Sequence, residues 1–198
     1  MSWYRSLYTL KAISFLLEAG VKTNIHYVLM KDSIKEAIEL LEGDKFPKGI
    51  NAVVFLLHKP VGLGSDTQII RKENPDLKRF LECIERKQFS FKIGFDSCTV
   101  PALLGSSSFA SRSMDTCEGG RWSAYISSDL KMMPCSFDNQ KQQWSVDLRS
   151  STIQEAWFSK VFDDFRSHLK NACPECRHRI NCMGGCPICP EIVLCSVR

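Results

Sequence analysis

CPECRHRINCMGGCPICPEIVLC, residues 173–195, holds six of the ten cysteines of this 198-residue chain. Its first four cysteines have the spacing C-x2-C-x5-C-x3-C. In a reducing compartment such clustering indicates metal binding before disulfides, so the sequence favours iron–sulfur clusters or structural zinc. Zinc ribbons separate their two C-x2-C pairs by about 12–20 residues, more than any gap here. The piece C-x3-C-P at residues 182–187 also occurs in bacterial ferredoxins. The spacing therefore favours iron–sulfur over zinc, and a disulfide scaffold or buried free thiols remain a third alternative.

Composition narrows the class of protein. The hydrophobic content of 44% and charged content of 24% are ordinary for a globular chain and exclude disordered, collagen-like and coiled-coil classes. The net charge of +4 is small and evenly spread, which argues against nucleic acid as a partner. No apolar run approaches the ~18 residues of a membrane span. Arg5, Lys11 and Glu18 interrupt the N-terminal segment, so it does not read as a secretory signal and we expect a cytoplasmic protein with no membrane contact.

The first hundred residues alternate between helical and strand patterns. Ser33-x-x-Glu36 predicts a capping box, Asn74-Pro75 predicts a helix start, and Gly20 stands where a helix would end. The run VVFLL, residues 53–57, is typical of a strand buried on both faces of a parallel sheet. The patterns predict helices near 7–17, 34–41 and 75–84, and strands at 21–30, 50–57 and 91–95. This order is that of a parallel α/β sheet.

Three strands are too few to close an eight-stranded barrel of about 250 residues. The first strand would also leave an open edge, which favours aggregation unless something covers it. We therefore expect the chain to be the C-terminal piece of a larger fold, or to bind an N-terminal partner chain at this edge.

The pattern changes near residue 105. A polar loop at 106–113 is followed by a predicted strand–turn–strand over 123–134. A helix then begins at Ser151-x-x-Gln154 or Thr152-x-x-Glu155, and a second helical stretch runs to Leu169. We predict two domains, 1–105 and 106–198.

The second half resembles the SPASM domain that ends many radical S-adenosylmethionine (SAM) enzymes. The cysteines of that pattern are present in order: Cys117, Cys135, Cys173, Cys176, Cys182, Cys186 and Cys195. The chain departs from it at Leu130, where the family's turn has glycine, and we expect a different turn there. The segments GVKTNIHYVL (20–29) and INAVVFLLHKPVGLG (50–64) resemble the fifth and sixth strands of the radical SAM partial barrel. The resemblance implies the C-terminal portion of a partial (β/α) barrel, followed by a small cysteine-rich α+β SPASM-type iron–sulfur domain.

The resemblance also implies two auxiliary 4Fe–4S clusters with interleaved ligands. One would be held by Cys173, Cys176, Cys182 and Cys195, and the other by Cys117, Cys135, Cys186 and an upstream residue. We expect that residue to be Cys98, which ends the third strand; the alternative is a buried free thiol. Cys83 lies in a helical pattern and is expected in the core. Cys189 is surplus, either inert or an alternative ligand.

Ligands of parallel α/β folds meet the carboxyl ends of the strands. These ends are Met30-Lys31-Asp32, His58-Lys59-Pro60 and Asp96-Ser97-Cys98. Asn24 and His26 share the strand face opposite Ile25 and Tyr27, toward the lumen of a barrel. We therefore predict that Asn24 contacts cofactor or substrate and that His26 or Asp96 transfers a proton. For each, an ordinary hydrogen-bonded structural role is the alternative.

What the resemblance implies about function is a peptide- or protein-modifying maturase whose auxiliary clusters bind substrate or accept electrons. A third 4Fe–4S cluster, which cleaves SAM, would be held by a CxxxCxxC loop after the first barrel strand, and we expect that this sequence has none. We therefore expect SAM and that cluster only in the full-length context, with a flavodoxin- or ferredoxin-type protein as reductant. Whether this chain alone is an enzyme stays open. The alternatives are a stand-alone iron–sulfur electron carrier or scaffold, and a structural zinc module that mediates protein contacts.

Overall fold

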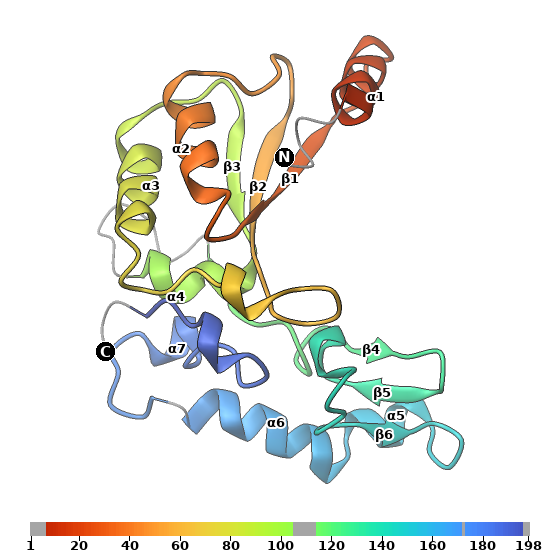
Figure 1. Cartoon of the computed structure of the whole chain (residues 1–198). Helices are drawn as coiled ribbons and strands as arrows, with labels where there is room; N and C mark the ends of the chain where they lie inside the picture. Colours follow the sequence, from red (N-terminus) through yellow and green to blue (C-terminus); the bar gives the residue numbers. More distant parts are fainter. Residues whose placement is uncertain (1–6, 105–113, 172, 196–198) are drawn as a thin grey trace.

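The computed structural model describes residues 7–104, 114–171 and 173–195. Three parallel strands form a sheet in the order β1 (Asn24–Leu29), β2 (Ala52–Leu57) and β3 (Lys92–Phe95). The connecting helices α2 (Ile34–Glu42) and α3 (Pro75–Arg86) lie side by side against one face of it (Figure 1). Sequential parallel strands joined by helices are the repeating unit of a (β/α) barrel. The predicted parallel α/β architecture is confirmed.

The two faces of the sheet differ in burial. Along β1 the side chains alternate, with Ile25, Tyr27 and Leu29 buried toward the helices and the intervening residues exposed. In β2 the run predicted to be buried on both faces is covered more fully on the helical side, because Val54 and Leu56 are only half-buried. The open face therefore carries Asn24 and His26, as the alternation predicts.

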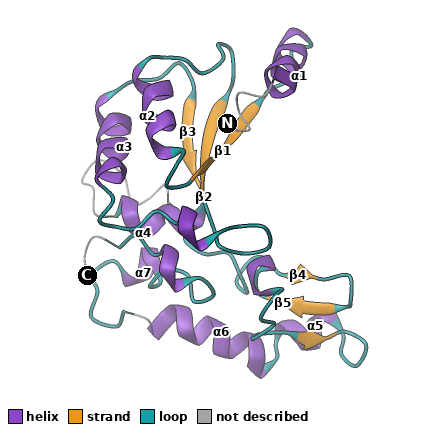
Figure 2. Ribbon diagram, viewed as in Figure 1, coloured by secondary structure: helices purple, strands orange, loops and turns teal. Residues whose placement is uncertain are grey.

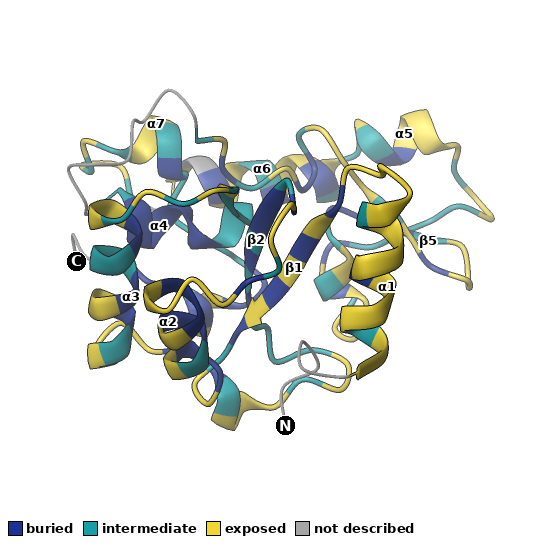
Figure 3. Cartoon of the chain, turned by 90° about the horizontal axis from the view of Figure 1, so that it is seen from above, coloured by how far each residue is buried: buried dark blue, intermediate teal, exposed yellow. Residues whose placement is uncertain are grey.

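Helix α1 (Leu7–Glu18) stands apart, beside the start of β1 (Figure 1). The helix is where the sequence predicts it, and Gly20 has a φ of +71° just after its end. Ile13 is its one buried residue, whereas Leu7, Tyr8 and Phe15 are exposed. Seen from above, most of α1 is exposed while the inner side of α2 is buried (Figure 3).

The two predicted helix starts differ in outcome. At α3, the Asn74 side chain accepts a hydrogen bond from the Asp76 N–H at 2.9 Å, so the predicted start is confirmed. At α2, Ser33 makes no side-chain capping bond, and the predicted capping box is wrong. Its hydroxyl instead donates to the Val28 carbonyl, and Glu36 accepts from the Tyr27 hydroxyl at 3.0 Å. These tertiary bonds to β1 replace the local ones.

The second part begins with an antiparallel sheet, β4 (Tyr125–Ile126), β5 (Lys131–Met133) and β6 (Val146–Asp147). The predicted strand–turn–strand is confirmed; β6 is too short to leave a pattern. Helix α5 (Ile153–Trp157) opens with the Thr152–Glu155 capping box, one of the two predicted. Helix α6 (Lys160–Asn171) follows. The predicted polar loop and the domain boundary near residue 105 lie outside the described residues.

The turn between β4 and β5 keeps the conformation that glycine favours. Leu130 has a φ of +62°, its N–H donates to the Ser127 carbonyl at 3.0 Å, and the Ser127 N–H donates to the Lys131 carbonyl at 2.9 Å. A tight turn closed by a left-handed residue is a common three-residue hairpin connection. The expectation that Leu130 changes the turn is therefore wrong; the chain makes this turn with a strained leucine.

Short helical pieces occur in both parts of the chain, and η3 and α4 follow β3 where the chain leaves the parallel sheet (Figure 2). They are η2 (Asp66–Gln68), η3 (Ser97–Thr99), α4 (Val100–Leu103), η5 (Ser136–Asp138), α7 (Arg179–Cys182) and η6 (Pro190–Ile192). A single apolar core runs from Phe55 in the sheet to Phe165 in α6 and Ile192 in η6. This shared core places the ends of β2 and β3 against the cysteine-rich part. Among the described residues, no helix has both the length and the apolar character needed to cross a membrane.

Candidate metal centres

Four thiols meet where the sheet joins the second part. Cys98 follows β3 in η3, Cys117 comes before β4, Cys135 follows β5, and Cys186 comes after α7. Cys186 interacts electrostatically with each of the other three. We call Cys98, Cys117, Cys135 and Cys186 the first thiol set. Cys98, predicted as the upstream member, interacts with Cys186 and Cys117.

Burial keeps three of these thiols protonated. It raises the pKa of Cys98 to about 12 and that of Cys117 to about 11, and it also raises the pKa of Cys135. Thiols bind metals as thiolates, so loading this set with metal must release protons.

Backbone N–H groups point at the sulfurs in a repeating pattern. The Gly119 N–H donates to Cys117, the Phe137 N–H to Cys135, and the Ile188 N–H to Cys186, each from two residues farther along the chain. Gly184 does the same for Cys182 in the other group of cysteines. Each of these bonds favours the thiolate over the thiol. Hydrogen bonds to the sulfurs are also what tunes thiolate-bound metal clusters.

Cys189, surplus in the sequence prediction, lies against Cys186. Its side chain is buried, and its N–H donates to the Cys186 Sγ at 3.3 Å. The Cys189 S–H also donates to that sulfur. This bond, the backbone N–H bonds and nearby Lys59 all favour the Cys186 thiolate. Their effect outweighs burial, and the pKa of Cys186 is lowered to about 7. Cys189 therefore supports a neighbouring thiolate. The C-x2-C spacing of the pair was the sequence signal for this contact.

Cys173, Cys176, Cys182 and Cys195 form the second thiol set. All four line one cavity of about 390 Å³, between the end of α6, helix α7 and residues Pro101 and Leu104 of the α4 region. The other three thiols raise the pKa of Cys182, although burial contributes most. The Thr116 hydroxyl donates to the Cys182 carbonyl at 2.8 Å, which ties this set to the segment that carries Cys117.

A left-handed turn separates the two sets. Met183, Gly184 and Gly185 have φ values of +53°, +84° and +90°. A Cβ on Gly185 would lie 2.7 Å from a methyl carbon of Val193. The glycines were predicted to let backbone N–H groups approach sulfur, and the N–H of Gly184 does so. Position 185 requires glycine for other reasons, its positive φ and the close packing of Val193.

This turn also resolves an ambiguity of spacing. Cys182, Cys186 and Cys189 have the C-x3-C-x2-C spacing of a SAM-cluster loop, although they follow a helix rather than a barrel strand. In the structure Cys182 interacts with the second thiol set, while Cys186 and Cys189 lie with the first. The expectation that the sequence lacks a CxxxCxxC spacing is therefore wrong, although these three cysteines follow a helix and do not form one group in the fold.

A buried ion pair borders the first thiol set. Lys59 follows β2 and Asp96 follows β3, and their side chains are paired with only 10% and 15% of their surfaces exposed. The Lys59 Nζ lies 5.2 Å from the centre of the Phe137 ring. Burial lowers the pKa of Lys59, but nearby Cys98, Asp96 and Cys186 outweigh this effect and raise it. The ammonium group therefore stays charged at the edge of the thiols. The strand-end pattern had marked Lys59 as a candidate position only.

The other predicted site residues are placed as follows. Asp96 Oδ1 accepts from the Thr99 hydroxyl at 2.6 Å, and Oδ2 accepts from the Leu57 N–H at 3.1 Å besides pairing with Lys59. Asn24 Oδ1 accepts from the Asn51 amide at 2.6 Å, and His26 is exposed on the same sheet face. The structure does not bring Asn24 or His26 to either thiol set, and their roles stay predictions. Cys83 lies in α3 and packs against the core.

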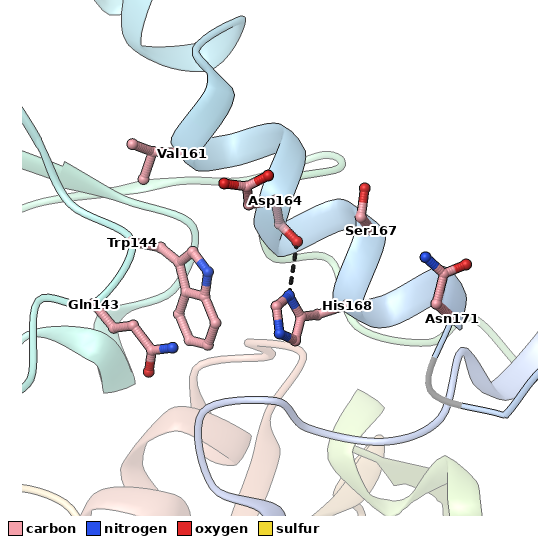
Figure 4. Close-up of a pocket in the computed structure, with 7 residues that line it drawn as sticks. All are labelled: Gln143, Trp144, Val161, Asp164, Ser167, His168 and Asn171. Carbon is pink, nitrogen blue, oxygen red and sulfur yellow. Dashed lines mark hydrogen bonds between the residues drawn. The ribbon is translucent and has the colours of Figure 1, made fainter.

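A separate hollow of about 540 Å³ lies along α6 and holds no cysteine (Figure 4). Its wall includes Trp144 and His168, whose rings meet edge to face with centres 5.7 Å apart. The His168 Nδ1 donates to the Asp164 carbonyl one helical turn earlier, at 2.9 Å. These contacts hold α6 against the loop before β6.

All ten cysteines are free thiols in the structure. In the described part of the chain, no three His, Cys, Asp or Glu side chains are close enough together to hold a single metal ion. The two thiol sets are therefore groups of neighbours rather than finished coordination spheres.

Comparisons with known proteins match this geometry. Residues 117–183 match the family model of SPASM, an iron–sulfur cluster-binding domain. No curated protein matches the chain. Among solved structures, SuiB of Streptococcus suis bound to S-adenosylmethionine matches over 95% of this chain and 47% of that one, with 19% identity and a TM-score of 0.63. SuiB bound to its precursor peptide SuiA gives the same values, and SuiB crystallised without either gives a TM-score of 0.62 over 48% of its chain.

At 19% identity the likeness to SuiB establishes the fold, and this chain spans about half of SuiB's length. The SPASM match includes Cys117 and Cys135 of the first thiol set and Cys173, Cys176 and Cys182 of the second. Together the comparisons confirm the resemblance to SPASM-containing radical SAM proteins: residues 117–183 match the SPASM model, and the chain has the fold of about half of SuiB.

Proposed function

We propose that the chain binds two 4Fe–4S clusters, one in each thiol set, and forms the auxiliary-cluster part of a radical SAM protein that modifies a peptide. The observation that carries this proposal is the sorting of eight cysteines, scattered between residues 98 and 195, into two groups of four, one of which lines a single cavity. Four thiolates are the usual ligand set of a 4Fe–4S cluster.

The residues around each set fit such a group. N–H donors aimed at Cys117, Cys135, Cys182 and Cys186 stabilise thiolates, and Lys59 supplies a positive charge beside the first set. When bound, the clusters would supply one-electron transfer. The chain's own residues hold the sulfurs and place the first set, well screened from water, beside the carboxyl ends of β2 and β3.

The peptide substrate is proposed from the likeness to SuiB, which has been crystallised with SAM and with its precursor peptide. The first hundred residues contain only Cys83 and Cys98, so the SAM-cleaving cluster would be supplied by an N-terminal half or a partner chain. The open edge of β1 is the place in the sheet where further barrel strands would pair. A small flavodoxin or ferredoxin would deliver the electron.

Anaerobic reconstitution tests the cluster proposal. We expect about eight iron and eight sulfide per chain, with broad absorbance near about 400 nm. The double variants C117A/C135A and C173A/C176A should each keep about four iron, because each removes one thiol set. The control C83A, which removes a core cysteine on α3, should keep about eight.

Three results would contradict the proposal. Two colourless zinc ions per chain would indicate a structural zinc module. Iron content unchanged in either double variant would show that the ligands have been misassigned. Formation of 5′-deoxyadenosine from SAM by this chain alone with dithionite would show that no other segment supplies the SAM-cleaving cluster.

A further inference from the structure

The proposed function uses the ion pair between Lys59 and Asp96 only as a positive charge beside the first thiol set. Both groups are largely buried, and a buried ion pair is stable only when its remaining polar atoms are satisfied. Asp96 meets this condition, since it accepts hydrogen bonds from Thr99 and Leu57. Asp96 is thus fixed to the ends of the sheet, and Lys59 is fixed through it.

The pair lies beside the first thiol set. Asp96 stands two residues before Cys98, and its partner Lys59 is near enough to Cys98, Cys135 and Cys186 to interact with each of them. The ammonium group also lies over the ring of Phe137, two residues after Cys135. The positive charge is therefore placed beside the first thiol set, while Asp96 is bonded to the N–H of Leu57 at the end of β2.

We propose that Lys59 sets the reduction potential of the cluster held by the first thiol set, and that Asp96 is the residue that positions Lys59. This inference rests on the proposed function. A 4Fe–4S core with four thiolates is an anion, and its one-electron reduction adds negative charge without breaking an iron–thiolate bond. A fixed positive charge in a poorly hydrated site favours the reduced state and so raises the potential.

The test is a redox titration of the reconstituted chain followed by electron paramagnetic resonance, with dithionite as the source of the electron. K59M should lower the potential of the first cluster by at least 59 mV, a tenfold change in the one-electron equilibrium. D96N should raise it, because the positive charge loses its counter-ion. The double variant K59M/D96N should fall between the two single variants, and K59R should stay near wild type. Opposite shifts of the potential in K59M and D96N follow from the opposite charges that the two variants remove. A merely structural role of the pair would not produce opposite shifts.

Two controls are built into the chain. The cluster of the second thiol set should keep its potential in every variant. Lys87 is matched to Lys59, because its Nζ donates to the Leu41 and Glu42 carbonyls and lies 5.7 Å from the Phe89 ring, but it lies at the end of α3. K87M should therefore leave both potentials unchanged.

Iron analysis of each variant precedes its titration and separates the two possible failures. A wild-type chain without iron would overturn the proposed function and this inference together. An iron-loaded chain whose first potential does not move in K59M, or moves the same way in K59M and D96N, would overturn only the role of Lys59. If K59M alone fails to fold, the comparison of K59M/D96N with D96N decides, because the two variants differ only at residue 59: the first potential should be lower in K59M/D96N, and equal potentials would overturn the role of Lys59.

Discussion

Replacing Gly185 with alanine probes the turn that directs Cys182 and Cys186 into different thiol sets. The change adds one methyl group at a residue with a φ of +90°. The new carbon would lie 2.7 and 2.8 Å from the two methyl carbons of Val193. Valine is stiff at χ1, so these carbons cannot turn away without moving the backbone.

The magnitude has two parts. A left-handed backbone costs an L-residue about 1–2 kcal/mol, and overpacking costs about 1–3 kcal/mol. Gly185→Ala should therefore lower the free energy of unfolding by about 2–5 kcal/mol. Gly20→Ala is the matched control, because Gly20 has a φ of +71° and open space where its Cβ would be. It should show only the first part, about 1–2 kcal/mol.

Urea unfolding of the reduced, cluster-free chain measures both variants. With an m-value of about 2 kcal/mol per M, a loss of about 3 kcal/mol moves the midpoint by about 1.5 M. Val193→Ala, added to Gly185→Ala, should recover the steric part and leave the backbone part, which a double-mutant cycle separates. The reasoning is refuted if Gly185→Ala destabilises no more than Gly20→Ala, or if Val193→Ala recovers nothing.

Two further predictions concern pH and the β4–β5 turn. In the cluster-free chain, the free energy of unfolding should rise between about pH 7 and 9, where Cys186 is ionised in the folded chain but still protonated in the unfolded chain. The free energy of unfolding should fall above about pH 9, because Cys98, with a folded pKa of about 12, stays protonated in the folded chain and ionises in the unfolded chain. Urea titrations across this pH range measure both changes. The rise should disappear in C186S, and a rise that survives in C186S contradicts its assignment to Cys186. Leu130→Gly should stabilise the chain by about 0.5–1 kcal/mol, because glycine adopts the φ of +62° without strain and the leucine side chain is 48% exposed. Thermal unfolding measures this change, Leu130→Asn should give a similar gain, and a loss of stability in both variants would show that the side chain packs more than its exposure indicates.

Hydrophobic periodicity predicted most of the first hundred residues correctly, because it is a local property. The run at residues 53–57 forms β2, and Asn74 caps α3 as its side chain predicts. Ser33 shows where local reasoning ends. Its hydroxyl has two competing uses, and the structure directs it to the Val28 carbonyl of β1 rather than to its own helix. The sequence pattern does not show whether the Ser33 hydroxyl bonds to its own helix or to the Val28 carbonyl.

Leu130 illustrates the opposite error. Its β-hairpin turn was expected to change because leucine avoids positive φ, yet the flanking bonds between Ser127 and Lys131 hold the turn in place. The strain of one residue is smaller than the sum of strand pairing and packing around it. The preference of a single residue for certain φ values contributes little free energy compared with several tertiary contacts that act together.

The order of residues was enough to predict a parallel α/β sheet and a cysteine-rich second half, and the cysteine pattern of that half resembles a SPASM domain. The first two follow from periodicity and composition, and the third from the resemblance. The tertiary structure adds what lies around the thiols. The left-handed turn at residues 183–185 leads from Cys182, which neighbours the second thiol set, to Cys186, which neighbours the first, and this grouping agrees with the one that the resemblance implies. The tertiary structure also placed the charge of Lys59 beside Cys98 and Cys186. Burial and distance through space set electrostatics, and neither can be read from the order of residues alone.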